Sequence, residues 1–289
     1  MEKTQTHKAP RKHHFIPKRM QEGWSDKNSL IFGVDRRVPA KPRAFIDKPC
    51  NVNSENHLYS VYEEKGQRNS FLETALYKPL DDSAANLTSQ ILEALKRGMV
   101  PQLDKSARRL LWQFYIYNSV KRRPDAKDFM FDPIFEAEVN QRIFKNAKAE
   151  GLELTTQELE YSIEEKTNLL QSFRGEQSEQ SLAIMEQNHV RFWSIEGKGS
   201  FVLPDRPISL LDRVVRYNRK MVIPISPHFA IQPIIGIEKC DHRTFLPAQV
   251  RLLNEVWYSN STTVISTSQQ LLKSLAKKID DQSIRFQHK

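Results

Sequence analysis

Two adjacent histidines near the N-terminus, His13 and His14, are the residues in this sequence best suited to acid–base or metal chemistry. A neutral imidazole can accept a proton or bind a metal ion near neutral pH. Pro17 predicts the end of a strand through Phe15 and Ile16, because proline cannot donate a hydrogen bond to a neighbouring strand. If Phe15 packs inward, strand alternation places His13 on the same face and His14 on the opposite one. The alternative is a basic arm whose histidines only titrate.

Two carboxylates could complete a metal site with these histidines. Glu73 begins a predicted helix, and hard cations favour carboxylate oxygens, although an acid also stabilises a helix N-terminus. Asp205 follows an apolar strand and lies between Pro204 and Pro207, which restrict the backbone and the direction of its carboxylate. Such a placement suits a metal ligand or a base, and an Asx-type turn would use the same residue.

The charge of the chain favours a polyanionic partner. Lys and Arg number 44 against 35 acids, which gives a net charge of +9 and favours nucleic acid. The residues that we expect to contact phosphate groups are Arg11, Lys12, Lys18, Arg19, Lys48 and Arg123. Each has an ordinary alternative: Arg123 and its neighbour Arg122 can bind the last carbonyls of a helix, and a lysine in a loop is usually just solvated.

Several missing patterns argue against familiar classes of protein. Cys50 and Cys240 are the only cysteines and form no Cys-x-x-Cys pair, so a zinc site built from cysteines is excluded. The glycine-rich loops of common nucleotide-binding proteins, the Gly-x-Ser-x-Gly elbow and the His-Glu-x-x-His helix are also missing. No apolar run reaches the length of a membrane span, and the N-terminus has no apolar signal core. We therefore expect a cytoplasmic protein without a membrane partner.

Local patterns predict an α+β fold with a small N-terminal β unit, a helical middle, and C-terminal antiparallel strands and helices. Residues 1–12 read as a flexible basic arm, and residues 13–289 as a single α+β domain. The expected strands of the β unit are 29–34, 44–46 and 57–62, with His14 at its edge.

The periodicity of apolar residues predicts the remaining elements. The expected middle helices are a run from about residue 70 that Pro79 interrupts and Gly98 ends, a helix from 103 to 117 closed by Pro124, and further helices over 131–149 and 156–188. The expected C-terminal elements are a hairpin of 190–195 with 200–203, strands 221–225 and 229–232, and helices 249–259 and 264–279.

The string from His13 to Pro17 resembles the Asp/His-His-Ile-x-Pro strand of the ββα-metal (HNH) nucleases, in which the second histidine activates water. This resemblance implies His14 as a general base or ligand, and His13 as a ligand or orienting group. The HNH enzymes also need an asparagine and a later histidine or asparagine on a helix, and Asn28 and Asn51 match these only loosely.

The order of motifs along nearly the whole chain resembles the bacterial family known as domain of unknown function 4238 (DUF4238). The matching segments are His13–Pro17, Lys48, His57–Tyr59, Leu72–Glu73, Arg123–Pro124, Trp193, Pro204–Pro207, Pro224–Pro227, Asn254 and Tyr258. Pro204 departs from the usual small polar residue, and Met20–Trp24 match only loosely. The resemblance implies no activity, but it groups His13, His14, Glu73 and Asp205 as one polar site.

These patterns lead to a hypothesis of a metal-dependent, nuclease-like hydrolase acting on DNA or RNA, in a bacterial defence or mobile-element system. His14 and His13 would act with Glu73 and Asp205, and His13, Glu73 and Asp205 would hold a divalent Mg²⁺ or Mn²⁺ ion that stabilises the scissile phosphate. The alternative is a non-catalytic subunit of a defence complex that binds nucleic acid or protein. A third hypothesis is hydrolysis of a nucleotide or another small phosphate.

Overall fold

The computed structural model describes residues 12–38, 40–63, 68–126, 145, 148–149, 151, 163–206, 221–236 and 238–288. Arg11 and most of the predicted basic arm lie outside these residues, as do Pro207, most of the predicted helix 131–149 and the start of the predicted helix 156–188. The chain divides into two compact units: unit 1 is Met1–His13, Glu55–Lys78 and Val120–Gln177, and unit 2 is His14–Ser54, Pro79–Ser119 and Ser178–Lys289. The prediction of a single domain stays a prediction.

The first sheet of unit 2 joins strands from both ends of the chain. Its order is β13 (Gln287–His288), β3 (Arg43–Asp47), β2 (Ile31–Asp35), β12 (Thr263–Ser266) and β8 (Leu203–Pro204). The predicted strands around 29–34 and 44–46 are confirmed, and they pair antiparallel. The helix predicted from residue 264 is wrong at its start, because β12 is a strand between β2 and β8.

The second sheet of unit 2 has the order β11 (Asp241–Phe245), β7 (His189–Ile195), β10 (Phe229–Ile234) and β9 (Ile223–Pro224). β7 runs antiparallel to β10 and parallel to β11. The predicted hairpin of 190–195 with 200–203 is wrong, because β7 lies between β10 and β11 while β8 belongs to the other sheet. The strands predicted over 221–225 and 229–232 are confirmed as β9 and β10.

Helices cover these sheets because each carries an apolar stripe. Those of unit 2 are α1 (Lys18–Glu22), the 3₁₀ turn η1 (Pro49–Asn51), α2 (Lys78–Lys96), α3 (Lys105–Trp112), the π-helix η4 (Gln113–Asn118), α8 (Glu179–Met185), α9 (Pro247–Asn260) and α10 (Gln269–Ile279). α2 begins at the last residue of unit 1, and α4 (Ser119–Lys121) also falls on the division. Gly98 ends α2 as predicted, with a φ of 74°.

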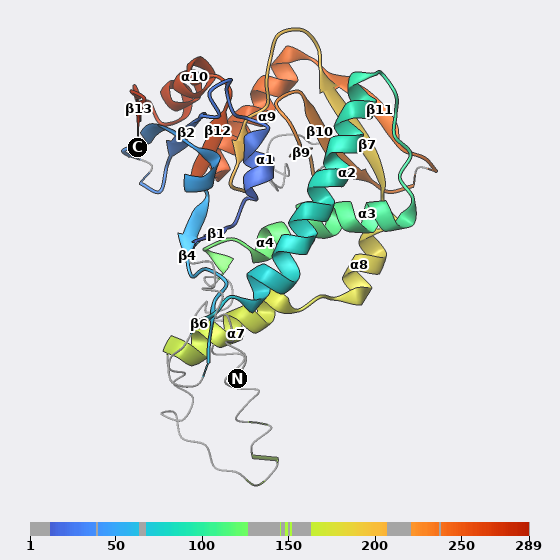
Figure 1. Cartoon of the computed structure of the whole chain (residues 1–289). Helices are drawn as coiled ribbons and strands as arrows, with labels where there is room; N and C mark the ends of the chain where they lie inside the picture. Colours follow the sequence, from blue (N-terminus) through green and yellow to red (C-terminus); the bar gives the residue numbers. More distant parts are fainter. Residues whose placement is uncertain are drawn as a thin grey trace, which may run out of the picture. The chain divides into compact units, whose positions relative to one another are not determined.

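Among the described residues of unit 2, three apolar clusters lie on the sheets, and the two largest lie between the sheets and the helices that Figure 1 draws around them. In one, α2, α3 and η4 pack against Val190 and Phe192 of β7 and Ile231 of β10. In the other, α9 and α10 pack around Trp257 and residues of both sheets. β7 therefore contributes apolar side chains on both faces, Val190 and Phe192 to the first cluster and Trp193 and Ile195 to the second.

Unit 1 contains the short strands β5 (Val61–Tyr62) and β6 (Arg68–Asn69), the π-helix η3 (Leu72–Tyr77) and α7 (Ile163–Gly175). The strand predicted over 57–62 is wrong for its first half, since residues 57–59 form a turn in which His57 has a φ of 61°. Pro79 does not interrupt the helix as predicted, because η3 continues directly into α2 and places the proline near its start.

A separate two-stranded sheet is formed by β1 (Lys12–His14) and β4 (Ser54–Asn56), and the division between the units runs through both strands. The prediction that His14 lies at the edge of the sheet that contains β2 and β3 is therefore wrong. Among the residues that the structure describes, no helix combines the length and apolarity needed to cross a membrane.

Candidate functional site around His14

The chain turns sharply after His14. β1 ends at His14, and Phe15 and Ile16 form a bend, so the strand does not continue to Pro17 as predicted. The Phe15 N–H still donates to the Asn53 carbonyl, at 2.9 Å. Pro17 is the N-cap of α1, and its carbonyl accepts the first hydrogen bonds of that helix. His14 is thus held where a strand gives way to a helix.

Gln21 on α1 connects this bend, through hydrogen bonds, to the segment that follows β3. Its side chain is fully buried, and its Nε2 donates to the carbonyls of Ile16 at 2.8 Å and Val52 at 3.1 Å. α1 and η1 are consequently neighbours. Nothing in the sequence distinguishes Gln21 from other glutamines, so this positioning role could be found only in the structure.

His14 is half-buried, and its Nε2 lies 3.2 Å from the Cys50 carbonyl oxygen in η1. A carbonyl oxygen can only accept, so Nε2 carries a proton, and the lone pair of a neutral His14 is on Nδ1. Histidines that act as bases or metal ligands are typically oriented in this way by an N–H donated to a carbonyl or carboxylate. His14 therefore has the tautomer and support that a base requires.

Three of the predicted phosphate-binding residues belong to the same two segments. Lys18 and Arg19 are exposed on α1, and Lys48 is exposed at the start of η1. Lys18 pairs with Glu22 at 3.3 Å, and both side chains are about half exposed, so this pair is well screened by solvent. We call His14, Lys18, Arg19 and Lys48 the His14 site.

The other predicted cations that the structure describes, Lys12 and Arg123, belong to unit 1. Lys12 is exposed in unit 1. Arg123, also in unit 1, forms a bidentate ion pair with Asp125, in which Nε lies 2.8 Å from Oδ1. This pairing neutralises much of the charge that would attract a phosphate.

Buried polar atoms on α1 and in the segments just after α1 and η1 were missed by the sequence analysis. Gln21 Oε1, both amide atoms of Asn53, and the hydroxyls of Ser25 and Ser54 are buried without a hydrogen-bond partner among the described residues. Buried polar groups are nearly always hydrogen-bonded, so each of these atoms is unusual. Asn53 also has a φ of 51°, which asparagine adopts more readily than most residues.

His13 lies in unit 1 and has a different environment. It is fully buried, its ring stacks on that of Tyr59 at 5.4 Å, and its Nδ1 accepts the Tyr59 N–H at 2.9 Å. The lone pair of a neutral His13 is therefore directed at the backbone, and Nε2 carries the proton. This tautomer favours the orienting role over the ligand role expected for His13.

Tyr59 is the centre of a packed cluster that continues from His13. The centroid of its ring lies 4.6 Å from that of Tyr77 in η3, and its hydroxyl donates to the Arg122 carbonyl oxygen at 3.0 Å. Burial raises the pKa of Tyr59 well above its ordinary value, against the lowering effect of Arg122. The Arg174 guanidinium lies 5.4 Å from the Tyr59 ring, and burial lowers its pKa. We interpret this cluster as the core of unit 1.

Glu73 is half-buried in η3, one turn before Tyr77. It thus shares unit 1 with His13, whereas His14 and Asp205 belong to unit 2. Within the described part of the chain, no three His, Cys, Asp or Glu side chains form a group arranged to hold a metal ion. The metal site of His13, Glu73 and Asp205 stays a prediction.

Asp205 directly follows β8, and its hydrogen bonds tie the end of β8 to the residues at the start of β12. Its N–H donates to the Thr263 carbonyl at 2.9 Å, and its carboxylate accepts the Thr262 N–H at 3.0 Å and the Thr262 hydroxyl. Burial raises the pKa of Asp205, and the bonds from Thr262 oppose this rise. These contacts favour the turn-stabilising interpretation of Asp205.

Replacing Asp205 by asparagine is expected to change the free energy of unfolding at pH 7 by less than about 1 kcal/mol, because an amide oxygen still accepts the Thr262 N–H. Alanine should cost about 2–3 kcal/mol, since it leaves buried donors without an acceptor. The folded pKa of Asp205 is raised, so its stabilising contribution is complete below the unfolded pKa near 4 and is lost as the pH rises through the folded pKa. As the pH falls from 7 to 4, the free energy of unfolding of wild type should therefore rise relative to that of the asparagine variant. Urea titrations at both pH values measure this difference. An asparagine variant as unstable as the alanine variant would contradict this role.

The other motif residues near β8 also have structural contacts. Asn254 of α9 is 1% exposed, accepts the Val202 N–H at 3.0 Å and donates to the Ser200 carbonyl at 2.9 Å. Trp193 stacks on Phe245 with the ring centroids 3.9 Å apart. The motifs of the C-terminal half therefore hold loops and sheets together.

Comparison with known proteins gives one match. The model of a family described as "Protein of unknown function (DUF4238)" matches residues 12–270, which include His13, His14, Glu73 and Asp205. No curated protein and no solved structure matches the chain. Because the family model covers most of the sequence, the chain belongs to the DUF4238 family.

Proposed function

We propose that this protein binds the phosphate backbone of a nucleic acid at the His14 site and cleaves it with His14 as the general base. The observation that carries the proposal is an imidazole oriented by the Cys50 carbonyl on two adjoining segments that also present Lys18, Arg19 and Lys48. The net charge of +9 agrees with a polyanionic partner.

In the binding step, the three exposed cations would contact phosphate oxygens. Such contacts fix the position of a nucleic acid without reading its sequence.

In the chemical step, His14 Nδ1 would take a proton from a water molecule while the water oxygen attacks phosphorus. The bond from phosphorus to the leaving oxygen breaks, and that oxygen takes a proton from solvent, leaving a phosphate monoester and a hydroxyl group. Lys18, Arg19 and Lys48 would stabilise the negative charge that develops. A divalent ion, if one takes part, would supply further charge stabilisation and would draw most of its ligands from water and phosphate.

The direct test is incubation of the full chain with single- and double-stranded DNA and RNA, in Mg²⁺, Mn²⁺ or EDTA. Cleavage that EDTA abolishes would support a mechanism in which His14 acts together with a divalent ion. Cleavage that continues in EDTA would support a mechanism in which His14 acts without a metal ion. Salt-sensitive binding without cleavage would overturn the catalytic step and leave a nucleic-acid-binding subunit. Neither binding nor cleavage would overturn the whole proposal.

Serine substitution of Lys18, Arg19 and Lys48 together is expected to weaken nucleic-acid binding at low salt. The slope of log K against log salt concentration should fall by roughly 2–3, because each lost phosphate contact reduces it by about 0.7–0.9. Filter binding at several salt concentrations measures this slope.

The matched control replaces three other exposed lysines of unit 2, Lys96, Lys198 and Lys277, and so removes the same charge elsewhere. An equal loss of slope in both triple variants would show a general effect of net charge and contradict a local phosphate site.

A further inference from the structure

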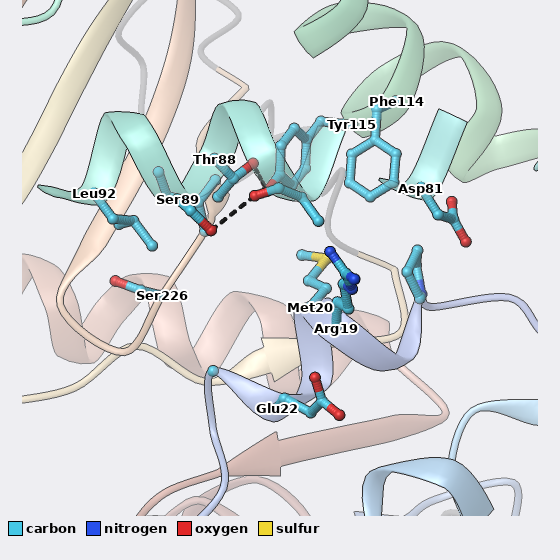
Figure 2. A pocket seen from close by; sticks show the side chains of 14 residues that line it. Arg19, Met20, Glu22, Asp81, Thr88, Ser89, Leu92, Phe114, Tyr115 and Ser226 are labelled. Carbon is cyan, nitrogen blue, oxygen red and sulfur yellow. Dashed lines mark hydrogen bonds between the residues drawn. The ribbon is translucent and has the colours of Figure 1, made fainter. Parts of the chain in front are cut away.

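A cavity of about 270 Å³ lies beside the His14 site in unit 2, and Figure 2 shows the side chains that line it. Its walls are α1, one side of α2 from Asp81 to Leu92, the π-helix η4 and the loop at Ile225 and Ser226. Arg19 thus belongs both to the His14 site and to the lining of this cavity. The volume is near the lower end of that of small-molecule sites, which begin at about 300 Å³.

The lining combines flat apolar surface with hydroxyl groups. Met20, Leu92, Phe114 and Ile225 supply the apolar part. Polar atoms come from Thr88, Ser89, Tyr115 and Ser226. Ligand sites are typically lined in this way, with a few polar groups that fix orientation within an apolar wall.

The aromatic wall of the cavity is part of the π-helix η4. Phe114 and Tyr115 are consecutive and both buried, with their rings perpendicular and the centroids 4.7 Å apart. The Tyr115 hydroxyl is 3.0 Å from that of Thr88, and burial raises the pKa of Tyr115, so it stays protonated. π-helical turns of this kind are rare and frequently occur at functional sites.

The charged residues that line the cavity are one cation, Arg19, and two acids, Glu22 and Asp81. In Figure 2, Arg19 and Met20 reach from α1 towards Tyr115, while the Glu22 carboxylate lies on the other side of the helix, where it pairs with Lys18. Asp81, from the first turn of α2, is at the edge of the view. A ligand with an anionic group at Arg19, an aromatic body and hydrogen-bonding edges would match this arrangement.

We propose that this cavity takes the base of a nucleotide whose phosphate is held by Arg19. The inference rests on the proposed function, because that function identifies the anion at Arg19 as a phosphate group. It adds a binding site for the base, which the His14 site does not contact. The base would stack against the Phe114 and Met20 surface, and its amino or carbonyl edge would meet the hydroxyls of Thr88, Ser89 and Tyr115. Stacking on aromatic side chains binds bases with little sequence preference.

The test is calorimetric titration of the full chain with adenosine 5′-monophosphate, ribose 5-phosphate and adenosine. Ribose 5-phosphate should bind at least about tenfold more weakly than the nucleotide, as expected when a base loses its stacking surface. Ala85 lines the cavity, so Ala85→Trp should fill it and reduce nucleotide affinity to that of ribose 5-phosphate. The control Asn86→Trp places the same ring at the next position of α2, which is exposed and outside the lining.

Equal affinity of wild type for the nucleotide and ribose 5-phosphate, or no binding of either, would overturn the inference. So would unchanged nucleotide binding in Ala85→Trp. Failure of the proposed function is distinguishable, because it appears as missing cleavage and missing salt-dependent binding of oligonucleotides. Neither of those measurements enters the comparison of the three small ligands.

Discussion

Replacing His14 by alanine is expected to lower the rate of phosphodiester cleavage by about 10²–10⁴-fold, the usual contribution of a positioned general base. Nucleic-acid affinity should stay within about threefold, because the phosphate contacts come from Lys18, Arg19 and Lys48. Single-turnover cleavage and filter binding on the same oligonucleotide separate the two effects. The difference between them identifies His14 as acting on the reaction and not on attachment of the substrate.

Two further variants protect this prediction from a folding artefact. His14→Gln can still donate an N–H to the Cys50 carbonyl but has no basic nitrogen, so it should fold like wild type and remain as inactive as the alanine variant. His242→Ala removes an exposed histidine of β11 and should retain full activity. Activity in His14→Gln above about a tenth of wild type would contradict the role of a general base.

Replacing Asp280 by alanine is expected to lower the free energy of unfolding by about 3–5 kcal/mol, the largest effect on stability that we anticipate. The Asp280 carboxylate accepts from Arg36 Nη2 at 2.7 Å and from Nε at 3.1 Å, and the two side chains are only 4% and 7% exposed. The Arg36 guanidinium lies 4.5 Å from the centre of the Tyr258 ring, and the Tyr258 hydroxyl donates to Asp280 at 2.8 Å. Loss of the carboxylate leaves a buried cation without its counter-ion.

Urea unfolding of unit 2 variants in the full chain measures this effect. A double variant, Arg36→Met with Asp280→Leu, should recover only part of the lost stability. No charge is then buried, but the Tyr258 and Ser261 carbonyls lose their donor and the Tyr258 hydroxyl loses its acceptor. Glu93→Ala breaks an exposed pair with Arg97, in which both side chains are about 70% exposed, and should cost less than about 0.5 kcal/mol. A loss below about 1 kcal/mol in Asp280→Ala would show that water reaches Arg36.

Some elements could be predicted because their signals are local. β2 and β3 were found from short apolar runs closed by charged residues and proline, and α9 from its helical period. The end of α2 at Gly98 follows from the left-handed conformation that glycine adopts at little cost. The α+β class and the DUF4238 family follow from the order of such signals, and both are confirmed.

Other elements were wrongly predicted because their state depends on distant partners. Residues 264–266 suit a helix or a strand by pattern, and they become β12 because β2 and β8 provide partners on both sides. Residues 57–59 alternate like a strand, yet the Tyr59 N–H bonds to His13 and its ring fills the core of unit 1. Phe15 and Ile16 bend away because Gln21 holds the Ile16 carbonyl.

The candidate site shows the same division. The sequence by itself identified His14 and the nearby cations, because residue type determines which side chains can carry a proton or a positive charge. Only the tertiary structure separated His14, bonded to Cys50, from His13, which is stacked on Tyr59, and gave Asp205 its contacts with Thr262. Tautomer, burial and ion pairing depend on atoms brought together by folding, and residues such as Gln21 and Arg36 therefore carry no signal in the sequence.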